Sequence, residues 1–244
     1  MSTPSDPTAN RRRWRMDLHL KLVRIAATSA TLDHLHRPIE QEIAAASQRI
    51  EEAARNVEDE YRDAVTDDEC ALVEELLGLA FVAAQTFITS VRTSIATLSK
   101  GCENDFGHPL TFVSDPKASC VFDTGDPLQA GSTHTAIRAI NEIANYWKHQ
   151  DDWPTREEIR NHRCVTVWGS ADARSGSNKR TVEIVSSIGM APLSSGNLRV
   201  AAKMLGVTDY EDLSPIRQKL RHWANALYEA ARQSVDQLGS TSGA

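Results

Sequence analysis

The sequence predicts a mainly α-helical protein, a helical bundle with a long loop-rich insertion and a small β-hairpin. Residues 16–100 and 197–237 carry apolar side chains at helical spacing almost throughout. Residues 100–133 are rich in Gly, Pro, Asp and Ser, which indicates a long loop. Runs of β-branched residues at 164–168 and 181–188 favour the two strands of a hairpin. Helices with one apolar stripe must pack on one another, which is typical of a bundle.

Length and composition fit one large globular domain. The chain has 244 residues, of which 41% are hydrophobic and 25% charged. We predict one helical domain over 11–237, with the hairpin inserted at about 164–188 and disordered tails at 1–10 and 238–244. A formal net charge of −6 argues against a surface coated for nonspecific nucleic-acid binding, but it permits a basic patch inside one cleft.

Neither a membrane segment nor a metal or cofactor site is expected. The longest apolar run, 76–88, is shorter than the ~20 residues of a membrane span, and no apolar core of a secretory signal follows the arginines at 11–15. We therefore predict a cytoplasmic protein that does not contact membranes. The four cysteines lack C-x-x-C spacing, which argues against a zinc site or a disulfide framework. These cysteines are Cys70, Cys102, Cys120 and Cys164.

Boundaries of the first helices follow from local signals. Pro38 indicates a helix break or a first-turn proline. The helix expected at 39–63 has a single apolar stripe, formed by Ile39, Ile43, Ile50, Ala54 and Val57. The sequence "TDDE" at 66–69 resembles a helix start, with a capping Thr, a Glu three residues later and acids in the first turn. The helix that follows, to about Leu98, is apolar on most sides and is predicted to be central.

Later elements are shorter until the last helix. One short strand is expected at 110–113, a helix at 132–150 and a short helix at 197–207 that ends near Gly206. Ser214 and Pro215 resemble the cap and first residue of the final helix. The buried stripe predicted for that helix is Ile216, Leu220, Trp223, Leu227 and Ala231.

The stretch "NEIANYWKHQDDW", residues 141–153, has the most distinctive pattern of polar residues. On a helix of about 100° per residue, apolar side chains gather on one side: Ala136, Ile140, Ile143 and Trp147. Opposite them lie Arg138, Asn141, Glu142, Asn145 and His149, with Lys148 at the edge. A solvated helix back explains the charges, and cations suit a helix C-terminus. Asparagine is a poor helix former, so two of them one turn apart predict that this face meets a partner helix, a ligand or a second subunit.

The segment "ANYWKH", residues 144–149, resembles the signature region of HEPN-like domains, which are small helical bundles of prokaryotic toxin, anti-phage and RNA-processing systems. The family's catalytic motif is an arginine, usually a following Asn, about three further residues and a histidine. Asn145 and His149 match the Asn and His, while Ala144 stands where the arginine would fall. The resemblance implies a site where two subunits or two repeats meet, and we expect a homodimer.

Metal-independent RNA cleavage needs a proton shuttle and a cation for the charge on the phosphate. His149 suits the shuttle, and Asn145 could hold the histidine or a phosphate oxygen. Lys148 or Arg138 could stabilise the developing charge. The segment "TREEIRNH", 155–162, adds Arg156 and Arg160 as supporting cations in place of the missing arginine.

Two functions are therefore predicted. The first is a HEPN-like metal-independent ribonuclease or RNA-binding protein of a bacterial defence or toxin system, partnered by RNA and by an antitoxin or other protein. The alternative is a noncatalytic helical protein–protein interaction module. An enzyme needs His149 in a cleft near a cation, whereas an interaction module needs only a complementary surface.

Overall fold

Two very long antiparallel helices dominate the architecture. The computed structural model describes residues 7–113, 119–128, 132–149, 176–191 and 195–238. Helix α1 (Pro7–Asn56) and helix α2 (Asp59–Phe106) form a hairpin, and at 50 residues α1 is about 75 Å long. Among the described residues the only β-pairing is an isolated bridge between Pro127 and Thr135. The prediction of a mainly helical bundle is therefore confirmed.

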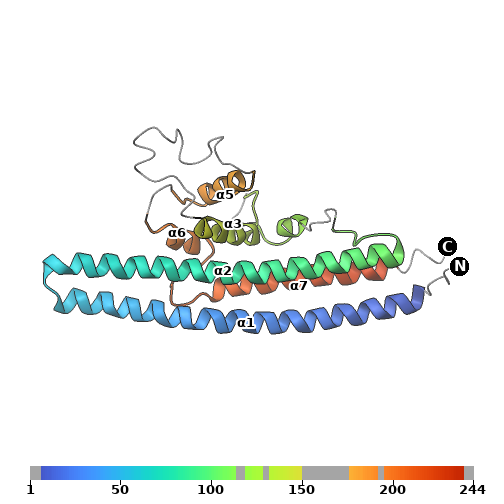
Figure 1. Cartoon of the computed structure of the whole chain (residues 1–244), viewed down its shortest axis with the longest axis horizontal. Coiled ribbons are helices and arrows are strands. Elements are labelled where there is room, and N and C mark those ends of the chain that lie inside the picture. Colours follow the sequence, from blue (N-terminus) through green and yellow to red (C-terminus); the bar gives the residue numbers. More distant parts are fainter. Residues whose placement is uncertain (1–6, 114–118, 129–131, 150–175, 192–194, 239–244) are drawn as a thin grey trace.

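The shorter helices pack around the hairpin, mainly against α2 (Figure 1). Helix α7 (Ser214–Leu238) packs along α1 and α2 in the half that holds the chain ends. Helix α3 (Ala136–Lys148) packs on α2 on the side away from α1 and also contacts α7, and α5 (Gly176–Ser187) packs on α3. Helix α6 (Asn197–Met204) also contacts α2. A short 3₁₀ helix, η1 (Ser119–Asp123), precedes α3 and contacts it.

The core follows α2, which was predicted to be central. Its buried side chains recur every three or four residues, so that α1 and α7 pack against one continuous apolar surface. They include Leu77, Phe81, Ala84, Ile88, Val91, Ile95 and Leu98. All five residues of the stripe predicted for the last helix are buried in α7, as expected. On α1 the buried residue near the hairpin turn is Ala53, whereas the predicted Ala54 is exposed.

Two indole rings fill positions that only glycine permits on α2. A Cβ atom on Gly78 would lie 2.2 Å from the Trp147 ring, and one on Gly101 would lie 2.0 Å from the Trp14 ring. Trp14 also donates from Nε1 to Asp105 Oδ2 at 3.0 Å. These contacts let α3 and the start of α1 approach α2 more closely than any side chain would allow.

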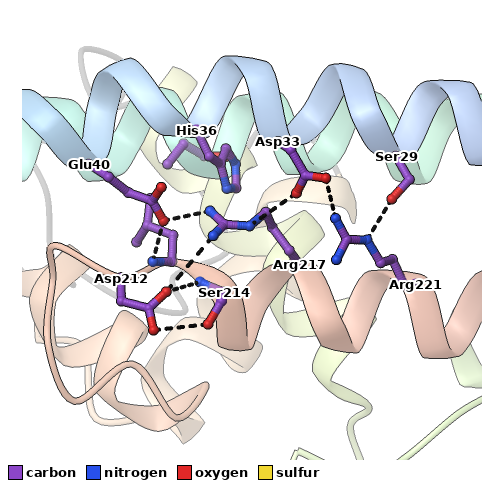
Figure 2. A network of polar contacts seen from close by, with 10 residues as sticks. Ser29, Asp33, His36, Glu40, Asp212, Ser214, Arg217 and Arg221 are labelled. Carbon is purple, nitrogen blue, oxygen red and sulfur yellow. Dashed lines mark hydrogen bonds and ion pairs between the residues drawn. The ribbon is translucent and has the colours of Figure 1, made fainter.

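A ladder of ion pairs joins α1 to α7, as Figure 2 shows. Arg217 contacts Asp33 Oδ1 at 3.2 Å and Glu40 Oε1 at 2.5 Å. Arg221 donates to Ser29 Oγ at 2.6 Å and also pairs with Asp33. The Arg217 side chain is only 14% exposed, so these charges lie at the edge of the core, where a paired charge is much less costly than an unpaired one.

The loop before α7 completes this ladder. Asp212 accepts hydrogen bonds from the amide of Ser214 at 2.8 Å and from its hydroxyl at 2.9 Å, and these bonds lower the pKa of the Asp212 carboxyl. Next to the ladder, His36 is fully buried, and its Nε2 lies 3.2 Å from the carbonyl oxygen of Ala80 on α2. The polar surface between α1, α2 and α7 is thus fixed by specific pairs.

Two predicted helix boundaries are wrong. Helix α1 continues through Pro38, and α2 begins at Asp59, seven residues before "TDDE". The Thr66 hydroxyl does not cap a helix start but donates to the carbonyl of Arg62 one turn earlier, at 2.9 Å. Pro38 is exposed, while His36 and Ile43 on either side of it are buried, so packing on α2 maintains the helix despite the missing amide.

Both predicted strands that can be compared are also wrong. Residues 110–113 form a turn, closed by a bond from the Val113 amide to the Leu110 carbonyl at 3.0 Å. Residues 181–187 belong to helix α5. There Thr181, Ile184, Val185 and Ile188 are buried, at helical spacing, and tertiary packing outweighs the strand preference of β-branched residues. The other predicted strand, 164–168, lies outside the described residues.

Helix α2 and the chain ends also differ from expectation. The segment Tyr61–Phe106 is long and apolar enough, by length and composition, to cross a membrane, because uncharged residues extend the run at 76–88. A core helix of a bundle has the same property, so the absence of membrane contact stays a prediction. Helix α1 already begins at Pro7, inside the predicted tail 1–10, and residues 1–6 and 239–244 lie outside the described residues.

Candidate functional site

Helix α3 carries the polar stripe singled out in the sequence. Thr135 caps it, because its hydroxyl oxygen accepts from the Arg138 amide at 3.2 Å and its hydroxyl donates to the Phe122 carbonyl. Ala136, Ile140 and Ile143 are buried, as the helical pattern predicts, and Trp147 packs partly buried against α2. The capped helix is fixed between α2 and α5, which sets the direction of each polar side chain.

Both asparagines bond to Gln85 of α2. Gln85 Nε2 donates to Asn145 Oδ1 at 2.7 Å, to Asn141 Oδ1 at 3.1 Å and to the Asn141 carbonyl at 3.2 Å. Gln85 interrupts the apolar run of α2, and this interruption is the sequence signal for its role. The polar stripe therefore meets a partner helix within the chain.

The same asparagines bond to a buried carboxylate. Asn141 Nδ2 donates to Glu142 Oε1 at 3.0 Å, and Asn145 Nδ2 donates to Glu142 Oε2 at 3.1 Å. The Thr181 hydroxyl of α5 donates to Glu142 Oε2 at 2.6 Å. Glu142 is only 6% exposed, and hydrogen bonds to a charged acceptor offset the cost of burying it. We call Gln85, Asn141, Glu142, Asn145 and Thr181 the α3 network.

The α3 network engages the side-chain amide of Asn145, which the ribonuclease hypothesis needs for contact with the histidine or a phosphate oxygen. Its amide oxygen and its amide nitrogen are both engaged inside the chain. Burial of Glu142 and the role of Thr181 were not predicted, because the polar stripe indicates a solvated or binding face and α5 was expected to be a strand. Networks of this kind fix one packing arrangement when every member is satisfied.

Arg138 is committed to a different contact. It donates to Asp123 Oδ1 from Nε at 2.9 Å and from Nη2 at 2.6 Å, and its guanidinium stacks 5.4 Å from the Phe122 ring. The Arg138 side chain is 11% exposed. Arg138 lies in the first turn of α3, whereas His149 directly follows the helix. The two positions are eleven residues apart, which corresponds to about 16 Å along the helix axis. The structure does not bring these two predicted site residues together.

Ala144, the position of the HEPN-like arginine, is fully buried. A guanidinium at this position would lie in the core, out of reach of a phosphate. The packing therefore explains why an alanine stands where the family's motif has an arginine: the residue before Asn145 lies on the apolar side of α3.

Lys148 and His149 are the exposed members of the predicted site. They end α3, where the His149 amide donates to the Asn145 carbonyl at 3.2 Å. Their position at a helix C-terminus suits positive charge. Arg156 and Arg160 lie outside the described residues.

A second set of polar contacts, absent from the sequence-based predictions, anchors α6. Asn197 Nδ2 donates to the Tyr146 hydroxyl at 3.0 Å, and Glu74 accepts from the Leu198 amide at 2.9 Å and from Arg199 Nε at 2.9 Å. A carboxylate at the first turn of a helix stabilises it. These contacts hold α6 against α2 and α3.

Among the described residues no group of three or more His, Cys, Asp or Glu side chains could hold a metal ion. Comparisons with protein-family models, curated proteins and solved structures find no match to this chain.

Proposed function

We propose that the protein is a noncatalytic helical interaction module. The α3 network carries this proposal. Asn145, which an RNA-cleaving site would use, bonds instead to Gln85 and Glu142, and Arg138 bonds to Asp123. These bonds support a role for the polar face of α3 in fixing the helical bundle.

An exposed apolar surface supports the same proposal. Met16, Leu20 and Val23 of α1 are 60%, 58% and 56% exposed, and Ala27 and Ala30 continue their line. We call these five residues the α1 stripe. A surface helix normally carries polar residues on the side opposite the core, and contiguous exposed apolar residues are typical of interaction sites.

An RNA-directed function is the second candidate. Lys148 and His149 are exposed and adjacent at the end of α3, where a histidine could shuttle a proton beside a cation. With the HEPN-like resemblance, this favours a ribonuclease or an RNA-binding protein of a defence or toxin system. The buried Ala144 and the engaged Asn145 weigh against the catalytic form.

Cleavage of RNA distinguishes the two functions. A pool of labelled RNAs is incubated in EDTA with the wild-type protein and with His149→Ala, each shown to be folded by circular dichroism. An interaction module leaves the pool intact with both proteins across the pH range. Cleavage by the wild type that disappears in His149→Ala would overturn the proposal and establish the ribonuclease.

A further inference from the structure

The α1 stripe has the spacing of a coiled-coil seam. Its residues follow one another at intervals of four, three, four and three, the pattern that presents one apolar line to another helix. Helix α1 already packs on α2 and α7 through a separate line of buried residues, which includes Leu18, Ile25 and Leu32. Helix α1 therefore has two apolar faces, and only one is covered within the chain.

We propose that the α1 stripe pairs with the α1 stripe of a second copy of this chain, with the two helices antiparallel. The inference rests on the proposed function, because it names the partner of the interaction module. It differs from the dimer implied by the HEPN-like resemblance, which would meet at the helix that carries the histidine motif.

Charge complementarity favours the antiparallel arrangement. Asp17 and Arg24 follow Met16 and Val23 directly, so they lie on the same flank of the stripe, seven residues apart. A twofold axis between residues 21 and 22 brings Arg24 of each copy beside Asp17 of the other, giving two equivalent ion pairs. Asp17 otherwise contacts Lys21 at 3.3 Å, and none of the ion pairs among the described residues involves Arg24.

The sizes of the side chains favour the same arrangement. Around that axis Leu20 faces Val23 of the other copy, and Met16 faces Ala27, so each of these layers combines a larger side chain with a smaller one, while Ala30 lies opposite Arg13. A parallel pair would instead align methionine with methionine and alanine with alanine, leaving the seam wide at one end and narrow at the other. It would also place Arg24 beside His19. Protein interiors are close-packed with few voids, which favours layers of even width over a tapering seam.

In the antiparallel arrangement the other helices of each copy lie outside the interface. With the axis between residues 21 and 22, residues 7–36 of the two α1 helices overlap, and the halves of the hairpins that carry the turns extend in opposite directions. Helices α2 and α7 pack on other sides of α1 and do not occupy the seam.

Leu20→Glu tests whether the stripe is the interface. Sedimentation equilibrium of the wild type is expected to give twice the chain mass of 26.9 kDa at high concentration. Leu20→Glu is expected to weaken the dimer at least about tenfold, because a hydrophobic layer near the axis becomes charged. Leu35→Glu is the matched control: it is on the same helix, 49% exposed and outside the stripe, so it should leave the dimer unchanged.

Charge exchange tests the antiparallel orientation. Asp17→Arg and Arg24→Asp each place like charges together and are expected to weaken the dimer, while the double variant D17R/R24D restores it. An equimolar mixture of the two single variants should form heterodimers in preference to either homodimer, since every Arg then faces an Asp. A parallel pair predicts no rescue by either route.

Each outcome bears on one proposal. A wild type that is monomeric up to ~500 μM, or a dimer that Leu20→Glu leaves intact, overturns the second-copy inference. A dimer that the double variant and the mixture fail to rescue overturns the antiparallel arrangement. None of these results depends on RNA cleavage, which separately tests the proposed function.

Discussion

His36 should make the folded protein sensitive to mild acid. The imidazole is fully buried, its Nε2 lies 3.2 Å from the Ala80 carbonyl, and its Nδ1 has no hydrogen-bond partner among the described residues. Burial, together with the smaller effect of the nearby Arg217 charge, lowers the pKa of His36 to about 4, against the raising effects of the Ala80 bond, Glu40 and Asp33. The ring is therefore neutral in the folded protein, with its proton on Nε2.

The size and direction of the effect follow from proton linkage. Between the unfolded pKa of 6.5 and the folded pKa of about 4, the unfolded chain binds a proton that the folded protein does not. The contribution of neutral His36 to the free energy of unfolding is therefore fully present above about pH 6.5, and it is lost progressively as the pH drops toward 4. The difference between the two pKa values corresponds to a loss of about 3 kcal/mol, of which about 2.5 kcal/mol is reached by pH 4.5.

His36→Leu isolates this contribution, because every other ionisable side chain is the same in the two proteins. We expect the free energy of unfolding, measured in urea between about pH 7.5 and 4.5, to fall more steeply for the wild type than for His36→Leu. The difference between the two proteins should change by about 2.5 kcal/mol across this range. A difference that stays constant with pH would refute the assignment of a buried neutral His36.

Two further predictions test the packing of α2. Gly78→Ala places a Cβ 2.2 Å from the Trp147 ring, so thermal or urea unfolding should show a net loss of about 1–2 kcal/mol even though Ala is the better helix former. The double variant with Trp147→Leu should lose less than Gly78→Ala alone, and an equal or larger loss would contradict the close approach. Burial raises the pKa of the Cys102 thiol to about 11. Iodoacetamide at about pH 8 should therefore label Cys102 in the native protein much more slowly than the partly exposed Cys70. Peptide mass mapping measures the two labelling rates. Equal labelling would place Cys102 outside the core.

Much of the bundle could be predicted because burial leaves a periodic pattern. The stripe of α7, from Ile216 to Ala231, and the apolar side of α3 recur at helical spacing and are buried in the structure. The all-round apolar stretch of α2 likewise indicated the central helix. In these elements local preference and tertiary packing favour the same residues.

Local signals misled where tertiary contacts outweigh them. Pro38 and "TDDE" suggested helix boundaries, yet both lie inside helices held by long-range packing. The β-branched residues at 181–188 suggested a strand, although their buried positions also fit a helical repeat. A cap or a strand preference contributes only about 1 kcal/mol, less than the burial of one large side chain.

The candidate site was predictable in position but not in role. The two asparagines indicated correctly that this face of α3 meets another element, but Gln85 lies 56 residues before Asn141, and nothing local connects them. The same is true of Thr181, 39 residues after Glu142. Pairing between distant residues depends on how the helices dock.

The central claim is that the polar face of α3 holds the bundle together, and the free energies of unfolding of Asn145→Ala and His149→Ala test it most directly. The two residues lie about one turn apart, Asn145 in the last turn of α3 and His149 directly after it. Asn145→Ala removes the hydrogen bonds to Gln85 and Glu142, so it should cost about 1–3 kcal/mol, while the exposed His149→Ala should stay within about 0.5 kcal/mol of the wild type. An Asn145→Ala protein as stable as His149→Ala would contradict the claim and leave Asn145 available for a site.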